Sequence, residues 1–227
     1  IICLTYNSKK IIIDKYNIPV GNISIIPTCV DTKIFNPINK TKKSDLIKIV
    51  YLGTTKGAYN ISKILSHFKS LLMVEKNFYL TIITKDNHSE LFSKFKKLDI
   101  DNSFYKIVSL DGEKLINEIS DNDIGIFYLN NNFSIKASFP TKIAELFSLG
   151  IPIVCNNFNE DIYFYINQYD VGRIHDFEEK NIIKFKEKLE MLKHNKKIIN
   201  NCRNLAQDKL SLDYSFNKYS KIYNDIK

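Results

Sequence analysis

The sequence predicts a doubly wound α/β fold around a parallel sheet, and two observations lead to this prediction. From about residue 47 to residue 175, short apolar runs alternate with amphipathic segments. The apolar runs are nearly continuous instead of alternating apolar with polar residues, which is typical of strands buried on both faces of a parallel sheet. Strands and helices that alternate in this way are the pattern of a doubly wound domain.

The predicted elements follow from apolar periodicity. In the first predicted helix, apolar residues recur every three or four positions, which gives the helix one face for the core. The strands are expected at residues 47–52, 78–84, 105–110, 123–129, 151–155 and 171–174, and the connecting helices at residues 60–72, 89–97, 113–119 and 141–149.

The two ends of the chain do not fit into this domain. The front is expected to form a strand at 2–6, a helix at 8–16 and a strand at 23–26, followed by a connector that contains prolines. The length of 227 residues corresponds to about one and a half domains of roughly 150 residues each. Because the first residue is Ile1 and lies in an apparent strand, we expect the chain to be a fragment that carries the end of a second domain.

The back of the chain, from residue 178 onward, is expected to be helical. Its last helix carries aromatic and apolar residues at helical spacing, and such a stripe is typical of packing in a core or between domains. The stripe consists of Tyr214, Phe216, Tyr219, Ile222 and Tyr223.

The composition excludes several classes of protein. With 44% hydrophobic and 26% charged residues, the chain is ordinary for a globular protein. The net charge of +8 comes with lysines scattered along the chain and no basic run interleaved with aromatic residues, so nucleic acid is not an expected partner. No apolar run reaches the roughly 18 to 20 residues that cross a bilayer. The four cysteines lack metal-ligand spacing, and we interpret them as reduced thiols.

The loop after the first predicted strand of the sheet is a candidate ligand site, because doubly wound sheets bind ligands at the carboxyl ends of their strands. It reads G-T-T-K-G-A-Y at residues 53–59. Its glycines allow close approach of the backbone, its hydroxyls and Lys56 can donate hydrogen bonds, and a helix N-terminus follows. The loop matches neither G-x-G-x-x-G nor a P-loop. By itself it fits either a phosphate-binding loop or a plain strand-to-helix turn.

A stronger signal surrounds the start of the helix expected at 141–149. Pro140 suits a first helical turn, where its missing N–H would have no partner. The N–H groups of that turn, with Thr141 and Lys142, make an anion site. Glu145 lies one turn further on, where a carboxylate can accept two hydrogen bonds from a vicinal diol such as a ribose; the alternative is a solvated helix residue. Gly150 is expected to end the helix.

Four segments, in order, resemble the family 4 retaining glycosyltransferases of the GT-B fold. P-T-K-I-A-E at 140–145 and L-G-I-P-I-V at 149–154 are similar to the nucleotide-sugar motif of that family. I-I-P-T-C-V-D-T-K-I-F-N-P at 25–37 resembles the linker between its two Rossmann-like domains. V-Y-L-G at 50–53 and D-N-D-I-G-I at 121–126 resemble two strands of its C-terminal domain.

The resemblance implies how the chain is divided. Residues 1–40 would be the end of an N-terminal acceptor domain and the interdomain linker. Residues 41–210 would form the C-terminal domain that binds the nucleotide sugar. Residues 211–227 would be a helix that packs toward the N-terminal domain.

The resemblance also assigns roles. Glu145 would hold the ribose hydroxyls, and the amides around Phe139 and Thr141 would cradle the diphosphate. Lys142 and Lys56 are the expected catalytic residues, since fixed N–H donors and lysines stabilise the charge of the leaving diphosphate best in a closed cleft. The expected donor-binding residues are Gly53, Thr54, Thr55, Tyr59, Ser109, Leu110, Lys136, Ser138, Phe139, Thr141 and Glu145.

Two departures from the family pattern concern the sugar. Ala137 stands eight residues before Glu145, where the E-x7-E motif has its first glutamate. The usual Gly-Arg and later Lys are replaced by G-T-T-K at 53–56. These changes resemble a subset with a P-T-K-x-x-E segment, in which Lys142 and Tyr59 would take over contacts to the donor.

The expected activity is transfer of a hexosyl group from a nucleotide diphosphate sugar to a glycan or lipid-linked acceptor in cell-surface polysaccharide biosynthesis. This chain would supply the donor-binding half and be inactive alone. No cofactor and no metal are expected, because no D-x-D or histidine cluster is present. The expected site of action is the cytoplasm, with the +8 charge compatible with an anionic membrane surface.

Two alternatives stay open. A non-catalytic nucleotide- or glycan-binding module of the same fold would account for the alanine at position 137. An unrelated doubly wound protein, such as a signalling or epimerase domain, would lack the linker motif at residues 31–37.

Overall fold

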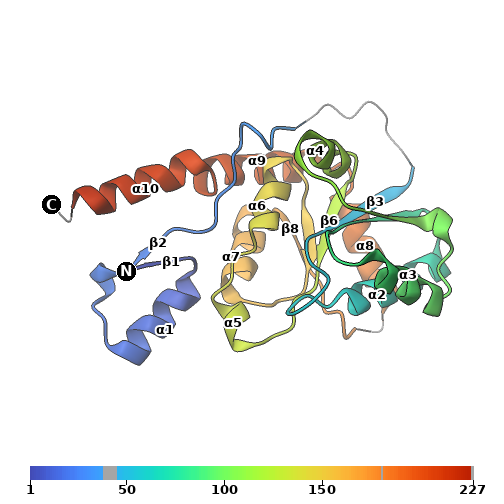
Figure 1. The fold of residues 1–227 in the computed structure, drawn as a ribbon, viewed down its shortest axis with the longest axis horizontal. Coiled ribbons are helices and arrows are strands. Elements are labelled where there is room, and N and C mark those ends of the chain that lie inside the picture. The colour runs from blue at the N-terminus through green and yellow to red at the C-terminus, as the bar shows by residue number, and fades with distance from the viewer. Residues whose placement is uncertain (38–44, 180, 226–227) are drawn as a thin grey trace.

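The main body of the molecule is a parallel six-stranded sheet with helices on both faces (Figure 1). The computed structural model describes residues 1–37, 45–179 and 181–225. Counted from the first strand of the sheet, the strand order is the Rossmann order 3-2-1-4-5-6. The predicted doubly wound fold is therefore confirmed. In spatial order the strands are β5 (Tyr105–Val108), β4 (Phe78–Ile83), β3 (Ile47–Leu52), β6 (Ile124–Phe127), β7 (Ile153–Cys155) and β8 (Gly172–Ile174).

Right-handed crossovers place the first two helices on one face of the sheet and the next ones on the other. The later helices complete both layers, since α8 packs against α2 and α9 packs against α6 and α7. The helices are α2 (Ile61–Val74), α3 (His88–Lys97), α4 (Gly112–Ser120), α5 (Phe133–Lys136), α6 (Thr141–Ser148), α7 (Glu160–Tyr169), α8 (Ile182–Leu192) and α9 (Lys196–Lys209).

The four helices predicted inside the sheet region lie within two residues of their predicted bounds. α6 ends at Ser148, and Gly150 follows two residues later with a φ of +74°, the left-handed conformation that favours glycine after a helix end. Several strands are shorter than predicted at their carboxyl ends; for example, β5 ends at Val108. Residues 109 and 110, expected in this strand, therefore belong to a loop.

The structure contains two helices, α5 and α7, that the apolar pattern did not predict. α7 carries aromatic residues on its exposed side, with Tyr163 and Phe164 about half exposed, and this blurs its apolar face. Its start is nonetheless marked by Asn159, whose side chain accepts a hydrogen bond from the backbone of Ile162.

The front of the chain forms a small unit of its own. β1 (Ile2–Cys3) and β2 (Ser24–Ile25) pair in parallel, with α1 (Tyr6–Tyr16) and a 3₁₀ turn (Val20–Asn22) between them. The first turn of α1 is tied to α7, because the carboxylate of Asp161 accepts hydrogen bonds from the backbone of Tyr6 at 2.7 Å and of Asn7 at 3.0 Å. Through these two hydrogen bonds, the buried Asp161 joins the front unit to the main body.

The segment after β2 runs back along the main body. The hydroxyl of Thr28 donates to the carbonyl of Phe139 at 2.8 Å, and the hydroxyl of Ser148 donates to that of Phe35 at 2.6 Å. Val30 pairs with Ser211, just before α10 (Leu212–Asn224). The predicted boundary at residues 40 and 41 lies outside the described residues, as do residues 226 and 227 of the predicted last segment.

Helix α10 leaves the main body and runs beside β1 and β2, so that both termini lie at the same end of the molecule (Figure 1). The Lys218 ammonium donates to the carbonyl of Ile25 at 3.2 Å. Of the aromatic stripe, Phe216 is 70% exposed and Tyr223 is 63% exposed. These side chains are thus outside the core of this chain. None of the described helices combines the length and apolar character that a membrane span requires.

Candidate functional site

The candidate site lies where the order of the sheet reverses. β3 and β6 are neighbours, but the chain leaves them in opposite directions, and doubly wound sheets bind ligands at the carboxyl ends of such a pair. The loop after β3 is bonded to the segment after β6. The backbone N–H of Asn60 donates to the carbonyl of Tyr128 at 3.0 Å, and the backbone N–H of Asn130 donates to the carbonyl of Ala58 at 2.8 Å. Two loops that are distant in sequence therefore form one wall.

A cavity of about 310 Å³ opens at the carboxyl ends of β3, β4 and β5. It brings together four of the residues predicted from the sequence, Gly53, Thr54, Leu110 and Lys142. The side chain of Lys142 reaches it from α6 and passes Gly53 closely, since a Cβ on that glycine would lie 4.0 Å from the Lys142 Cγ. The remaining lining residues are Leu52, Ile83, Thr84, Lys85, Asp86, Asp111 and Leu115.

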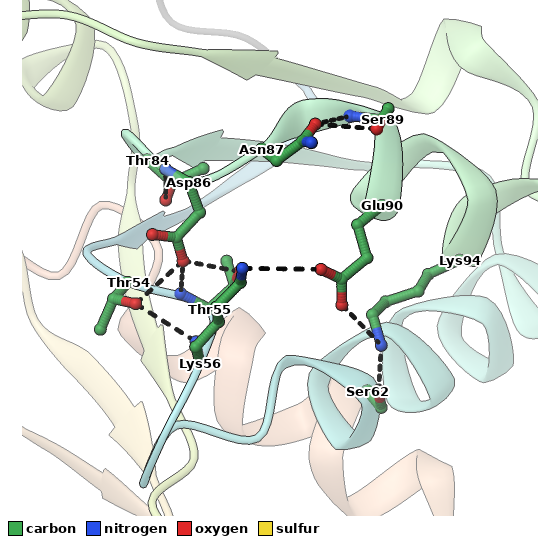
Figure 2. Close-up of polar contacts among 10 residues, drawn as sticks. All are labelled: Thr54, Thr55, Lys56, Ser62, Thr84, Asp86, Asn87, Ser89, Glu90 and Lys94. Atoms are coloured by element: carbon green, nitrogen blue, oxygen red, sulfur yellow. Dashed lines mark hydrogen bonds and ion pairs between the residues drawn. The ribbon is translucent and has the colours of Figure 1, made fainter.

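Asp86, which follows β4, organises the loop after β3 (Figure 2). Its Oδ2 accepts hydrogen bonds from the Thr55 amide at 2.6 Å and from the hydroxyls of Thr54 and Thr55, both at 2.9 Å. Burial tends to raise the pKa of Asp86, but these hydrogen bonds and the charge of Lys56 outweigh it and hold that pKa below its ordinary value. Asp86 is therefore ionised near neutral pH, and it takes the two hydroxyls that sequence reasoning assigned to a ligand.

Residues of β3 and α3 make further contacts with the same loop. The hydroxyl of the buried Tyr51 donates to the carbonyl of Thr54, and burial raises the pKa of Tyr51 far above its ordinary value. The ammonium of Lys56 lies 3.9 Å from a carboxylate oxygen of Glu90 on α3, and both side chains are more than half exposed (Figure 2). Lys56 is thus at the rim, paired with α3 and not with the cavity.

Lys142 and Glu145 form an ion pair on one face of α6. The Lys142 Nζ lies 3.0 Å and 3.1 Å from the two carboxylate oxygens of Glu145. The Glu145 side chain is only 9% exposed, whereas that of Lys142 is 38% exposed. Burial raises the pKa of Glu145, and the hydrogen bond and charge of Lys142 oppose that shift only in part. The alternative of a solvated helix residue at position 145 is wrong, because Glu145 is buried.

At the start of α6, the backbone amide of Ile143 donates to the carbonyl of Pro140 at 3.0 Å. In the part of the chain that the structure describes, Pro140 occupies the N-cap and no side chain caps the helix or adds an acidic group to its first turn. The preceding segment is fixed by Asn159, whose side-chain amide donates to the carbonyls of Ser138 at 2.7 Å and Ile135 at 3.1 Å. A helix N-terminus of this kind favours an anion through its N–H groups and its dipole.

The remaining predicted residues are more scattered. Phe139 is buried against the ring of Tyr165, so only its backbone is available to a ligand. Tyr59 packs edge-on against Tyr51, and Ser109 is exposed on the loop after β5. Lys136 lines a separate cavity of about 390 Å³ between α1 and the loops after β6 and β7. Among the described residues, no three His, Cys, Asp or Glu side chains gather as a metal site would require.

Sequence reasoning missed Asp86, Asn159 and Asp161. A signal existed for each, since Asp86 stands directly after a buried strand, and the run N-E-D at 159–161 carries an N-cap and an acidic first turn. Their partners, however, are distant in sequence. Only the folded chain shows that Asp86 bonds the loop after β3.

The fold and this crevice define the class of protein: a Rossmann-like α/β domain of the GT-B fold. The family model of the Glycosyl transferases group 1 matches residues 32–209, which is more than half of the chain. The chain therefore belongs to this family of glycosyltransferases. No curated protein matches the sequence.

Solved glycosyltransferase structures share the fold. A glycosyltransferase from Rickettsia africae ESF-5 superposes with a TM-score of 0.79 at 18% identity, over 99% of this chain and 62% of its own. A mutant of TarM from S. aureus, in complex with fondaparinux, alpha-GlcNAc-glycerol and UDP, gives 0.75 at 12% identity, over 98% and 43%. The C-terminal domain of the group 1 protein LpcC from Francisella tularensis gives 0.59 at 17% identity, over 81% and 99%. The chain thus spans less than two thirds of the first two structures.

Proposed function

We propose that this chain is the donor-binding half of a retaining GT-B glycosyltransferase of family 4, in its P-T-K-x-x-E variant. The enzyme would move a hexosyl group from a nucleotide diphosphate sugar to a glycan or lipid-linked acceptor in cell-surface polysaccharide biosynthesis. The observation that carries this proposal is the pair of Lys142 and the buried Glu145 at the uncapped start of α6, beside a cavity of about 310 Å³. It combines one carboxylate, one ammonium and a helix start without a side-chain cap.

These groups match the parts of a nucleoside diphosphate. The Glu145 carboxylate can accept both hydrogens of a ribose diol, and the base fits the cavity lined by Leu110 and Leu115. The Lys142 ammonium and the first-turn N–H groups of α6 can hold the diphosphate. Unliganded, Lys142 and Glu145 satisfy each other. Donor binding would therefore exchange one ion pair for two contacts with the ligand.

The same groups serve the reaction. As the bond between the sugar C1 and the diphosphate oxygen breaks, negative charge grows on the leaving diphosphate. Lys142 and the fixed N–H groups of α6 stabilise that charge where it develops. The oxygen of the acceptor hydroxyl forms the new bond to C1 on the same face of the sugar. Its proton passes to a base or to an oxygen of the departing diphosphate. We propose that these donors suffice without a metal.

The acceptor would be bound by an N-terminal domain, of which β1, α1 and β2 are the end. The LpcC domain, which matches over 99% of its own length and 81% of this chain, supports a division into two halves. The aromatic side chains of α10 would pack against that domain, and their exposure in this chain supports this proposal. An anionic membrane surface on the cytoplasmic side is the proposed place of action, since +8 charges favour it electrostatically.

Calorimetric titration of this chain with UDP, GDP and ADP tests the proposal. One of the three should bind, and Glu145→Ala should weaken that binding by about tenfold. Binding of none of them to a folded sample contradicts the proposal.

A second candidate, a non-catalytic module of the same fold, is favoured by Ala137, where the family motif has a glutamate. Sugar turnover by the full-length protein separates the two candidates. Turnover that is lost in Lys142→Ala excludes the module, whereas nucleotide binding without turnover favours it.

A further inference from the structure

The loop after β3 looks like a phosphate-binding loop, but its donors already have a partner. Three donors, the Thr55 amide and the hydroxyls of Thr54 and Thr55, converge on a single carboxylate oxygen of Asp86 (Figure 2). The Thr54 hydroxyl also accepts a hydrogen bond from the Lys56 amide at 3.3 Å. One carboxylate therefore fixes two successive residues of the loop and, through Thr54, a third.

The charge of Asp86 is unfavourable for the ligand class proposed above. Asp86 lines the cavity beside Lys142, and an ionised carboxylate there repels a diphosphate. Its pKa lies below the ordinary value, so it keeps that charge near neutral pH. A carboxylate at this place lowers the affinity for an anion unless it contributes something that outweighs the repulsion.

That contribution is the shape of the cavity wall. Gly53 and Gly57 have φ angles of +130° and +68°, so the loop turns sharply at both ends. Between them, the Tyr51 hydroxyl bonds the Thr54 carbonyl, whereas Asp86 bonds the Thr55 amide and both threonine hydroxyls. The Asp86 bonds hold Thr54 in the wall, next to the Gly53 backbone against which Lys142 packs. A released loop would have to be ordered again each time a ligand binds.

We propose that Asp86 is a positioning residue: its carboxylate tethers Thr54 and Thr55, and so presents Gly53 and Lys142 to the diphosphate of the donor. The threonine hydroxyls are thus loop tethers and make no contact with phosphate. This inference rests on the proposed function, since it requires that a nucleoside diphosphate binds at this crevice.

The test compares Asp86→Ala with a charge-matched control. Asp121 carries the same charge and pairs with Lys48 at 2.7 Å, but its side chain is 62% exposed and lies outside the cavity. Asp121→Ala should bind the nucleotide as tightly as wild type, because it removes a distant charge that solvent screens and leaves the loop in place. Asp86→Ala should bind about tenfold more weakly, because ordering the freed residues opposes binding. A cooperative thermal unfolding transition in each variant checks that it is folded.

Two further measurements separate tethering from direct contact. Amide hydrogen exchange at Thr55, without ligand, should be faster in Asp86→Ala than in wild type. Thr55→Ser keeps the hydroxyl and should retain wild-type affinity, whereas Thr55→Val should weaken binding. Thr55→Val should add no further loss in the Asp86→Ala background, since both changes cut the same tether.

The outcomes are distinguishable. Equal or tighter binding by Asp86→Ala overturns the inference, because the carboxylate then acts only as a repelling charge. Losses that add up in the double variant also overturn it, because the hydroxyl then contacts the ligand independently. Failure of wild type to bind UDP, GDP or ADP is instead a failure of the proposed function, and the inference falls with it.

Discussion

The loop after β3 and the start of α6 present the same kinds of group to the crevice, yet the fold uses them differently. Both combine backbone N–H groups, threonine hydroxyls and a lysine beside a helix N-terminus. In the loop, the Thr55 amide and both hydroxyls end on Asp86. At α6, no side chain caps the first turn within the described residues. Donors identify an anion site only when nothing inside the protein already accepts from them.

The two lysines differ in the same way. Lys142 is pinned to the buried Glu145 at the cavity, whereas Lys56 lies at the rim with the exposed Glu90. Charges in a poorly hydrated crevice act more strongly on a ligand than charges screened by solvent. Variants at the start of α6 should therefore cost more affinity than variants in the loop.

The largest effect is expected for Lys142→Ala. It should weaken nucleoside diphosphate binding by about 10- to 100-fold, because a charged hydrogen bond is lost and Glu145 keeps an unpaired negative charge beside the ligand. Isothermal titration measures the change. Lys94→Ala on α3 is the control for the loss of one positive charge. Equal losses in the two variants would show that only net charge matters.

A smaller effect, with a characteristic pH dependence, is expected for Glu145→Gln. At neutral pH it should bind about tenfold more weakly, since a neutral amide accepts less strongly from a ribose diol. A raised pKa means that Glu145 takes up its proton at a higher pH than the ordinary 4.5. Wild-type affinity should therefore begin to fall above that pH as the solution is acidified, and the Gln variant should show no such fall. Parallel pH profiles would exclude Glu145 as the ribose ligand.

The smallest effect is expected for Lys56→Ala. Its side chain is 61% exposed and its distance to Glu90 is 3.9 Å, so its contribution is screened by solvent. We expect a loss of about threefold or less in nucleotide affinity, measured at two salt concentrations. A loss above tenfold would mean that Lys56 leaves Glu90 and reaches the diphosphate in the complex, which would support the catalytic role predicted from the sequence.

The fold could be predicted from the sequence because it is encoded locally, and local patterns also indicated the start of α6 as a candidate site. Continuous apolar runs mark the strands of a doubly wound sheet, and Pro140, Glu145 and Gly150 mark the bounds and the polar face of one helix. Helical spacing alone predicted that Thr141 and Glu145 lie on a common face, one turn apart. α7 was not predicted, because its exposed aromatic residues obscure the periodicity of its apolar face.

The class of the sheet, the helix predicted at 141–149 and the residue types at its start can be inferred from the sequence, since they depend on periodicity and on neighbours a few residues away. Which of those groups are available to a ligand depends on contacts that form only in the folded chain. Asp86 and Thr55 are separated by 31 residues, and Asp161 and Tyr6 by 155. Hydrogen bonds form between groups that the fold brings within about 3 Å, and no local pattern specifies such pairs.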